Sequence, residues 1–169
     1  WKMNGLRKDL IQINNIENFF KKKIKFHNLA CVFCLPYTIL GLVVTKLKLR
    51  KIKIGAQDVS RKSSNHGAYT GQISSKMLKD LNCKFTIIGH SEIREIGETD
   101  NDISTKIGLA VENNLTVILC VGENLKEYKN NRSFSKVKTQ LYLNLKKNKK
   151  YLNKVIIAYE PIWSIGTGI

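Results

Sequence analysis

Three side chains suited to proton transfer lie beside apolar runs in this sequence. Glu160 comes directly after the run 155–159, His90 follows the run 85–89, and Lys2 precedes an amphipathic stretch. A carboxylate base, an imidazole that donates a hydrogen bond and a fixed positive charge are the groups needed to remove a proton next to a carbonyl. Taken singly, each has an ordinary structural explanation, so the hypothesis depends on a fold that brings the three together.

The segment after Glu160 has the composition of a closing lid. Proline stiffens its start, apolar residues fill its middle, and glycine gives freedom at its end. A lid of this kind would cover a ligand and exclude water. The alternative is a loop docked permanently on a neighbouring helix. The residues concerned are Pro161, Ile162, Trp163, Ser164, Ile165, Gly166 and Thr167.

Short apolar runs alternate with amphipathic stretches along the chain. The runs are near-continuous, as in strands that are buried on both faces of a parallel sheet. This alternation predicts one α/β domain over residues 1–169, with helices outside the sheet and chemistry at the carboxyl ends of the strands. Periodicity leaves both an open doubly wound sheet and a closed barrel possible. The runs are 29–34, 52–57, 85–89, 115–121 and 155–159.

The amphipathic stretches predict helices between these strands. Residues 37–50, 74–82 and 100–114 form three of them, and Asn101 or Asp102 is expected to cap the last. Two further stretches place apolar side chains on one helical stripe. These stripes are Leu6, Leu10, Ile13, Phe20 and Ile24 in the first, and Phe134, Val137, Leu141 and Leu145 in the second.

Composition is that of a soluble globular protein, with 43% hydrophobic and 25% charged residues. No apolar run approaches the roughly 18 residues of a membrane span, and no secretory signal is recognisable. The formal charge of +16 invites a nucleic-acid hypothesis. However, the lysine runs 21–23 and 146–150 fall where helices should end, and cations there suit the helix dipole. We therefore expect a cytoplasmic protein with neither a nucleic-acid nor a membrane partner.

The four cysteines are expected to be reduced thiols. Cys31 and Cys34 form a Cys-x-x-Cys, but the pair lies in an apolar run without a second Cys or His pair nearby. A packing role is favoured over a redox or zinc site.

Six blocks of the sequence, in order, resemble the triosephosphate isomerase family. The resemblance spans the whole chain and implies a TIM (β/α)₈ barrel. It also implies interconversion of dihydroxyacetone phosphate and D-glyceraldehyde 3-phosphate through an enediolate, a step of glycolysis and gluconeogenesis. The blocks are 1–5 (Trp-Lys-Met-Asn-Gly), 55–58 (Gly-Ala-Gln-Asp), 67–71 (Gly-Ala-Tyr-Thr-Gly), 88–92 (Ile-Gly-His-Ser-Glu), 120–123 (Cys-Val-Gly-Glu) and 158–168 (Ala-Tyr-Glu-Pro-Ile-Trp-Ser-Ile-Gly-Thr-Gly).

The resemblance also assigns roles to single residues. Glu160 resembles the base that moves the proton between adjacent carbons, and His90 the electrophile that polarises the carbonyl. Lys2 resembles the cation that holds the substrate and offsets the developing charge. Gly166 resembles the residue whose backbone N–H meets the substrate phosphate when the lid closes. Neither a metal nor an organic cofactor is expected.

Block 67–71 resembles a loop that projects into a partner subunit, which implies a homodimer with Thr70 near the loop tip. Three positions depart from the family pattern. Gln72 stands where glutamate is usual, Ile93 where a basic residue is usual, and Ile169 where the lid block ends in lysine. We expect the ion pairs that brace the dimer loop to be weakened or rewired.

The barrel is expected to be incomplete in this chain, because a full one needs about 250 residues. The 169 residues would supply about six βα units, without the start of the first strand or the seventh and eighth units. A fragment of this kind is expected to be weakly active or inactive. The alternatives are a non-catalytic remnant, including the product of a degraded gene, and a basic α/β binding module derived from the same fold.

Overall fold

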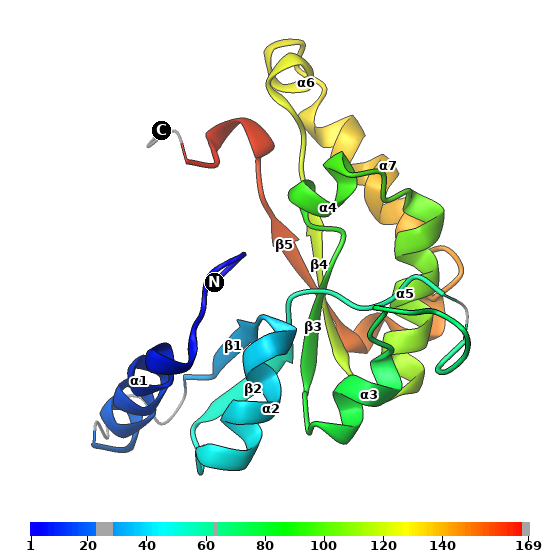
Figure 1. Ribbon diagram of the computed structural model, residues 1–169. Coiled ribbons are helices and arrows are strands. Elements are labelled where there is room, and N and C mark those ends of the chain that lie inside the picture. Colours follow the sequence, from blue (N-terminus) through cyan, green and yellow to red (C-terminus); the bar gives the residue numbers. More distant parts are fainter. Residues whose placement is uncertain (23–28, 63, 167–169) are drawn as a thin grey trace.

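The computed structural model describes residues 1–22, 29–62 and 64–166 (Figure 1). Among these residues, five parallel strands form one sheet. All five strands expected from the apolar runs are present and differ from the expectation only at their ends. They are β1 (Cys31–Leu35), β2 (Ile52–Ala56), β3 (Phe85–Ile88), β4 (Thr116–Val121) and β5 (Val155–Tyr159).

The strands lie in the sheet in the same order as in the sequence, β1-β2-β3-β4-β5. A doubly wound sheet reverses direction at a switch point, where its ligand binds. The described strands show no reversal, so the chain winds in one direction, as it does in a (β/α)₈ barrel. Strand order thus favours the barrel over the open sheet. Residues 1–6 form turn and coil without a strand.

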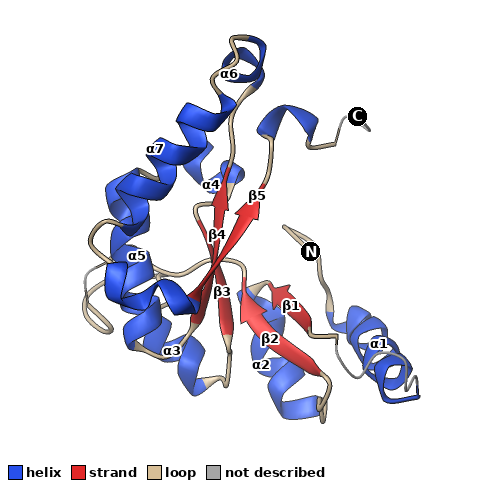
Figure 2. Cartoon of the chain, turned by 180° about the vertical axis from the view of Figure 1, so that it is seen from behind, coloured by secondary structure: helices blue, strands red, loops and turns tan. Residues whose placement is uncertain are grey.

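Helices connect successive strands, as parallel pairing requires. Figure 1 shows α3, α5 and α7 on one side of β3 and β4, and Figure 2 shows the same layering from behind. The α-helices are α1 (Leu10–Lys22), α2 (Tyr37–Lys46), α3 (Ser75–Asp80), α4 (Ser91–Glu95), α5 (Asp100–Glu112), α6 (Leu125–Lys129) and α7 (Ser133–Leu145). Short 3₁₀ helices are η1 (Arg7–Asp9), η3 (Lys149–Lys154) and η4 (Ile162–Ser164).

The hydrophobic core lies between the sheet and these helices. Val117 and Leu119 of β4 are fully buried, together with Ile103 and Ile107 of α5. Side chains that alternate with the core residues reach the other face of the sheet, where Ile87 lines a large cavity. One face of the sheet therefore supplies stability, and the other borders the space in which a ligand can bind.

Three details of the predicted helices are wrong, the first being that the helix expected over 37–50 ends at Lys46. The cap of α5 is Thr99, whose hydroxyl accepts a hydrogen bond from the Asp102 N–H while the Asp102 carboxylate accepts one from the Thr99 N–H. This reciprocal box places the cap two residues before Asn101. Leu6 and Phe134 are not in the core, since 63% and 81% of their surfaces are exposed. Leu6 precedes the helix, and Phe134 lies in the first turn of α7.

Five other residues of those stripes pack as expected. Ile13 is buried in the core, and Leu10, Val137, Leu141 and Leu145 pack against it. Ile24 and Lys23 lie outside the described residues.

Buried Glu17 fixes α1 to the strand that follows α2. Its carboxylate accepts hydrogen bonds from the backbone N–H groups of Arg50, Lys51 and Ile52 at 2.7 to 3.1 Å. Burial alone would raise the pKa of Glu17, but these hydrogen bonds and Lys21 lower it below its ordinary value.

Lysines gather at helix ends. Lys21 and Lys22 close α1, Lys46 closes α2, and Lys146 follows the last residue of α7. The positive groups thus meet the negative ends of the helix dipoles, as expected.

Candidate active site at the carboxyl ends of the strands

The sheet brings His90 and Glu160 together. His90 follows β3, Glu160 follows β5, and parallel strands end at the same edge. The His90 Nε2 lies 3.5 Å from the Glu160 Oε2, and about a fifth of each side chain is exposed (21% for both). Two of the three predicted catalytic groups therefore face each other across β4 at a solvent-accessible rim.

The Glu160 carboxylate is held at its other oxygen. The backbone N–H of Ser91 donates a hydrogen bond of 2.9 Å to Glu160 Oε1. The backbone N–H of Glu160 in turn donates to the Val121 carbonyl at 2.9 Å, which continues the pairing of β5 with β4 past the end of the strand. Both the main chain and the carboxylate of Glu160 are thus fixed by neighbouring strand ends.

Gly122 allows the backbone of Glu160 to lie directly against the loop that follows β4. A Cβ atom at position 122 would lie 1.8 Å from the Glu160 carbonyl oxygen, a distance that no real side chain tolerates. The sequence shows Gly122 within a recognised block but does not reveal that the backbone of Glu160 passes against it.

His90 is oriented by α4. Its Nδ1 accepts a hydrogen bond from the Glu92 N–H at 3.2 Å, and His90 is the N-cap of the helix that begins at Ser91. An accepting Nδ1 leaves the proton of a neutral imidazole on Nε2. Nε2, the nitrogen that faces Glu160, is therefore the hydrogen-bond donor.

Lys2 reaches this rim through Glu92. The ammonium lies 2.5 Å from Glu92 Oε1, and about half of each side chain is exposed (51%). This hydrogen bond raises the pKa of Lys2 and lowers the pKa of Glu92. The second Glu92 oxygen lies 3.8 Å from His90 Nδ1, so Glu92 links two of the predicted residues. Sequence reasoning assigned no role to Glu92.

A cavity of about 870 Å³ opens beside these residues. Lys2, His90 and Glu92 supply polar groups at its rim, while Phe33 and Ile87 contribute apolar surface. A mostly apolar pocket with a few convergent polar groups is the usual form of a small-molecule site.

The predicted lid is withdrawn from this cavity. None of the described lid residues 161–166 lines it. Trp163, in η4, donates a hydrogen bond of 3.0 Å from its indole nitrogen to Glu123 Oε1, and its ring stacks on Tyr128. Gly166 is exposed with φ 73°, a conformation that glycine adopts without strain. Thr167 and Ile169 lie outside the described residues.

Glu123 is the anchor of the withdrawn lid. It is fully buried, and the Tyr159 hydroxyl donates to both of its carboxylate oxygens at 3.0 Å. Burial would raise the pKa of this carboxyl, but hydrogen bonds from Trp163 and Tyr159 lower it below its ordinary value. A buried carboxylate thus joins β5, the lid and the loop after β4.

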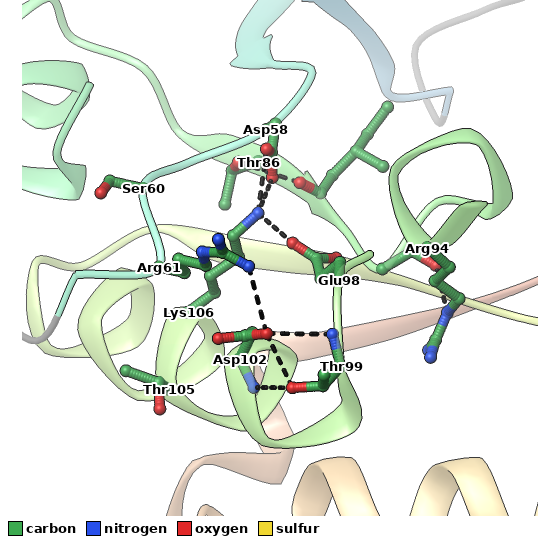
Figure 3. Close-up of polar contacts among 12 residues, drawn as sticks. Asp58, Ser60, Arg61, Thr86, Arg94, Glu98, Thr99, Asp102, Thr105 and Lys106 are labelled. Atoms are coloured by element: carbon green, nitrogen blue, oxygen red, sulfur yellow. Dashed lines mark hydrogen bonds and ion pairs between the residues drawn. The ribbon is translucent and has the colours of Figure 1, made fainter. Parts of the chain in front are cut away.

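Beneath the rim, Lys106 forms a buried ionic cluster. Figure 3 shows its ammonium between the carboxylates of Asp58 and Glu98. The Lys106 Nζ lies 2.7 and 2.9 Å from the two Asp58 oxygens. Nearby, the Arg94 guanidinium donates to the Gly89 carbonyl at 2.8 Å and pairs with Asp100. These contacts brace the loop that carries His90.

Thr70 does not reach this chain's own cavity. It lies in an exposed loop between Gly67 and Gly71, whose φ values of 142° and 81° require glycine-like backbone. Gln72 and Ile93 both line a separate pocket of about 220 Å³, so these two departures from the family pattern are neighbours in space.

Within the described residues, no cluster of three or more His, Cys, Asp or Glu side chains could hold a metal ion. None of the described helices has the length and apolarity to cross a membrane. Cys31 and Cys34 are unbridged, and burial raises the pKa of Cys34 to about 11, which suits a packed thiol.

Comparisons with known proteins agree with this geometry. The family model for triosephosphate isomerase matches residues 1–169. The chain is 38% identical over 170 residues to the triosephosphate isomerase of Alkaliphilus oremlandii, covering 99% of this chain and 66% of that relative. It is 40% identical over 173 residues to that of Mycoplasma mobile, covering 99% of this chain and 69% of that protein.

The fold also matches a solved structure, the triosephosphate isomerase of Bartonella henselae. The TM-score is 0.85 at 33% sequence identity, and the match covers 97% of this chain and 66% of the other. This chain thus spans about two thirds of the length of such relatives. Strand order, site geometry and these similarities together show that the chain belongs to the triosephosphate isomerase family and has the fold of a TIM barrel over that span.

Proposed function

We propose that this chain carries the proton-transfer centre of a triosephosphate isomerase. The reaction would interconvert dihydroxyacetone phosphate and D-glyceraldehyde 3-phosphate through an enediolate, as a cytoplasmic step of glycolysis and gluconeogenesis. The observation that carries the proposal is the distance of 3.5 Å between His90 Nε2 and a Glu160 carboxylate oxygen, because His90 itself lines a large cavity. A base and a hydrogen-bond donor on neighbouring atoms can act on adjacent carbons of one small substrate.

The chemistry follows from these two groups. The Glu160 carboxylate removes a proton from the carbon next to the substrate carbonyl, and the electrons of that C–H bond form the enediolate double bond. The carbonyl π electrons move to oxygen, where the His90 Nε2–H donates a hydrogen bond to the developing charge. Returning the proton to the other carbon completes the isomerisation without a net change in protons or electrons.

Lys2 and Gly166 bind rather than react. The Lys2 ammonium lies at the cavity rim and supplies positive charge for an anionic triose phosphate. When the lid closes, the backbone N–H of exposed Gly166 is free to meet the phosphate. The remaining lid residues then exclude water from the enediolate.

Proton exchange with solvent tests the proposal directly. The protein as its gene encodes it is incubated with dihydroxyacetone phosphate in D₂O, and deuterium entering the carbon next to the carbonyl is followed by NMR. Glu160→Gln should slow incorporation by about 10²- to 10⁴-fold, the usual contribution of a general base. Glu95→Gln, which changes an exposed glutamate of α4, is the matched control. Equal incorporation by the parent and by Glu160→Gln would overturn the assignment.

A homodimer is part of the proposal. The exposed loop 67–71 is free to project from the chain, and Thr70 at its tip would approach the site of a second copy. Gln72 and Ile93, neighbours in the smaller pocket, carry no charge, so they cannot form an ion pair with each other. We therefore expect a weaker dimer than in family members with charged residues at both positions. Sedimentation equilibrium of the parent against Gln72→Glu with Ile93→Arg measures this, and equal dissociation constants would contradict it.

A basic binding module would differ from an isomerase in its binding to DNA, and a catalytically dead remnant would show neither DNA binding nor turnover. Binding to DNA through lysines would fall steeply with salt concentration. The lysines at the ends of α1 and α2 are already explained by the helix dipoles. The joint presence of His90, Glu160 and Lys2 at one rim favours the isomerase.

A further inference from the structure

Helix α6 forms a fixed platform beside the withdrawn lid. The Asn124 side chain accepts from the Glu127 N–H, and the Glu127 carboxylate accepts from the Asn124 N–H, both at 2.9 Å. The Lys136 ammonium of α7 lies 2.9 Å from the other Glu127 oxygen. A reciprocal capping box and an ion pair to the neighbouring helix thus hold this five-residue helix in place.

Tyr128 presents its ring from this platform to the lid. The ring centroids of Tyr128 and Trp163 are 4.2 Å apart, with 25° between the planes. The edge of the same indole donates to buried Glu123. Trp163 is therefore held on two sides, at its N–H by a carboxylate and on its face by an aromatic ring. Tyr128 itself is half exposed (48%) and makes little contribution to the core.

We propose that Tyr128 is a positioning residue that holds the lid in its withdrawn state and so sets the closing equilibrium of the site. This proposal rests on the proposed isomerase function, because closure matters only where a ligand is enclosed. Trp163 does not line the cavity in the withdrawn state, so covering the cavity requires the indole to leave the Tyr128 face. Losing a stacked aromatic pair of this kind should change the closing equilibrium about 2- to 10-fold.

Solvent exchange of the Trp163 indole proton measures the withdrawn state without reference to activity. This proton is hydrogen-bonded to a buried carboxylate and exchanges when the lid undocks. Its NMR signal is assigned by its loss in Trp163→Phe. Tyr128→Leu should raise the exchange rate about 2- to 10-fold, whereas Tyr128→Phe, which keeps the ring, should leave it near the parent value.

Tyr142→Leu is the matched control, because Tyr142 is also an exposed helical tyrosine but has its ring beside Lys146 rather than the lid. If Tyr128→Leu does not fold, Tyr128→Gln removes the ring with a polar side chain suited to a half-exposed helix position. An exchange rate in the folded ring-deleted variant equal to that of the parent would overturn the proposal.

A kinetic measurement connects the contact to the site. When the withdrawn state is less populated, a larger fraction of the protein molecules can close over the substrate. The KM for dihydroxyacetone phosphate should therefore fall in Tyr128→Leu by the factor by which the exchange rate rises, and it should not fall in Tyr128→Phe. A raised exchange rate with unchanged KM would overturn the claim that the stack controls substrate access. For the protein as its gene encodes it, a raised exchange rate without any turnover supports the role of the stack and refutes the isomerase. Full turnover with an unchanged exchange rate supports the isomerase and refutes the role of the stack.

Discussion

Ser91 donates its backbone N–H to one oxygen of Glu160, a residue 69 positions further along the chain, at 2.9 Å. Ser91 is also the first residue of α4, and it follows directly after His90. A single peptide segment therefore orients both the imidazole and the carboxylate, and the relative position of these two groups depends on the start of this helix.

Ser91→Pro should remove this hydrogen bond alone. Proline is tolerated at the first helical position, and His90 already has φ −56° and ψ 142°, a conformation that proline favours in the preceding residue. Without the N–H the carboxylate loses a charge-assisted hydrogen bond, and kcat should fall about 10-fold or more. Steady-state kinetics provide the measurement. Ser91→Ala keeps the N–H and should stay close to the parent, so a similar loss in both variants would refute the role of the N–H.

Gly122→Ala should displace Glu160 from the rim. The added Cβ would meet the Glu160 carbonyl oxygen at 1.8 Å, so the end of β5 must move away from β4. We expect loss of isomerase activity by 10²-fold or more, on the order expected when a catalytic group shifts by about 1 Å. Activity and urea unfolding should be measured together. Gly41→Ala is the control, because a Cβ there meets nothing within 4 Å and alanine favours helix α2. Full activity of Gly122→Ala would contradict the prediction, since it would show that the end of β5 moves aside without displacing Glu160.

Docking of the lid should weaken in acid. The Trp163 hydrogen bond helps to lower the pKa of Glu123, so ionised Glu123 favours the docked lid, and this preference is lost as the pH falls through the lowered folded pKa. Protonation removes an acceptor from Trp163 and Tyr159. The indole exchange rate of Trp163, corrected for intrinsic pH dependence, should therefore rise below about pH 4.5. Glu123→Gln should show raised exchange already at neutral pH and no further rise in acid; a pH response identical to the parent would assign the effect to another group.

Lys106→Met should destabilise the fold strongly. It leaves Asp58 and Glu98 without their shared cation, and one Glu98 oxygen already lacks a hydrogen-bond partner. Burial raises the pKa of Glu98, and Lys106 opposes this rise, so without the ammonium the acid becomes still easier to protonate. Removing one partner of a buried ion pair costs about 3–5 kcal/mol. Urea denaturation should show this loss, while Lys76→Met, at an exposed position of α3, should change stability by about 0.5 kcal/mol or less.

The sequence predicts the strands and the positions of His90, Glu160 and Lys2 because these depend on local patterns. Apolar runs of five to seven residues between amphipathic stretches predict strands, and a parallel sheet puts their carboxyl ends at one edge. Glu92, Gly122, Glu123 and Tyr128 are different, since their roles come from contacts that no local pattern encodes. Lys2 and Glu92 are 90 residues apart, and Tyr159 and Glu123 are 36 apart.

Errors in the prediction have the same origin. The periodicity of the α7 stretch places Phe134 on the apolar stripe, but Phe134 is exposed. Periodicity does not show how far along a helix the contacts with neighbouring elements extend. The sequence predicts the cap of α5 at Asn101 or Asp102, within the helix, because Asn and Asp are common caps. Thr99 takes the role instead because Asp102 completes the reciprocal box three residues later.

Strand order has a consequence for synthesis on the ribosome. Each strand pairs with the strand synthesised just before it, in the order β1-β2-β3-β4-β5. A strand that emerges from the ribosome can therefore pair at once with the edge strand already formed. Assembly can therefore proceed from the amino-terminal side without waiting for distant segments. Glu160 is the last of the three chemical groups to be translated, after Lys2 and His90. The strands that support Lys2 and His90 can therefore pair before Glu160, the proposed base, is synthesised.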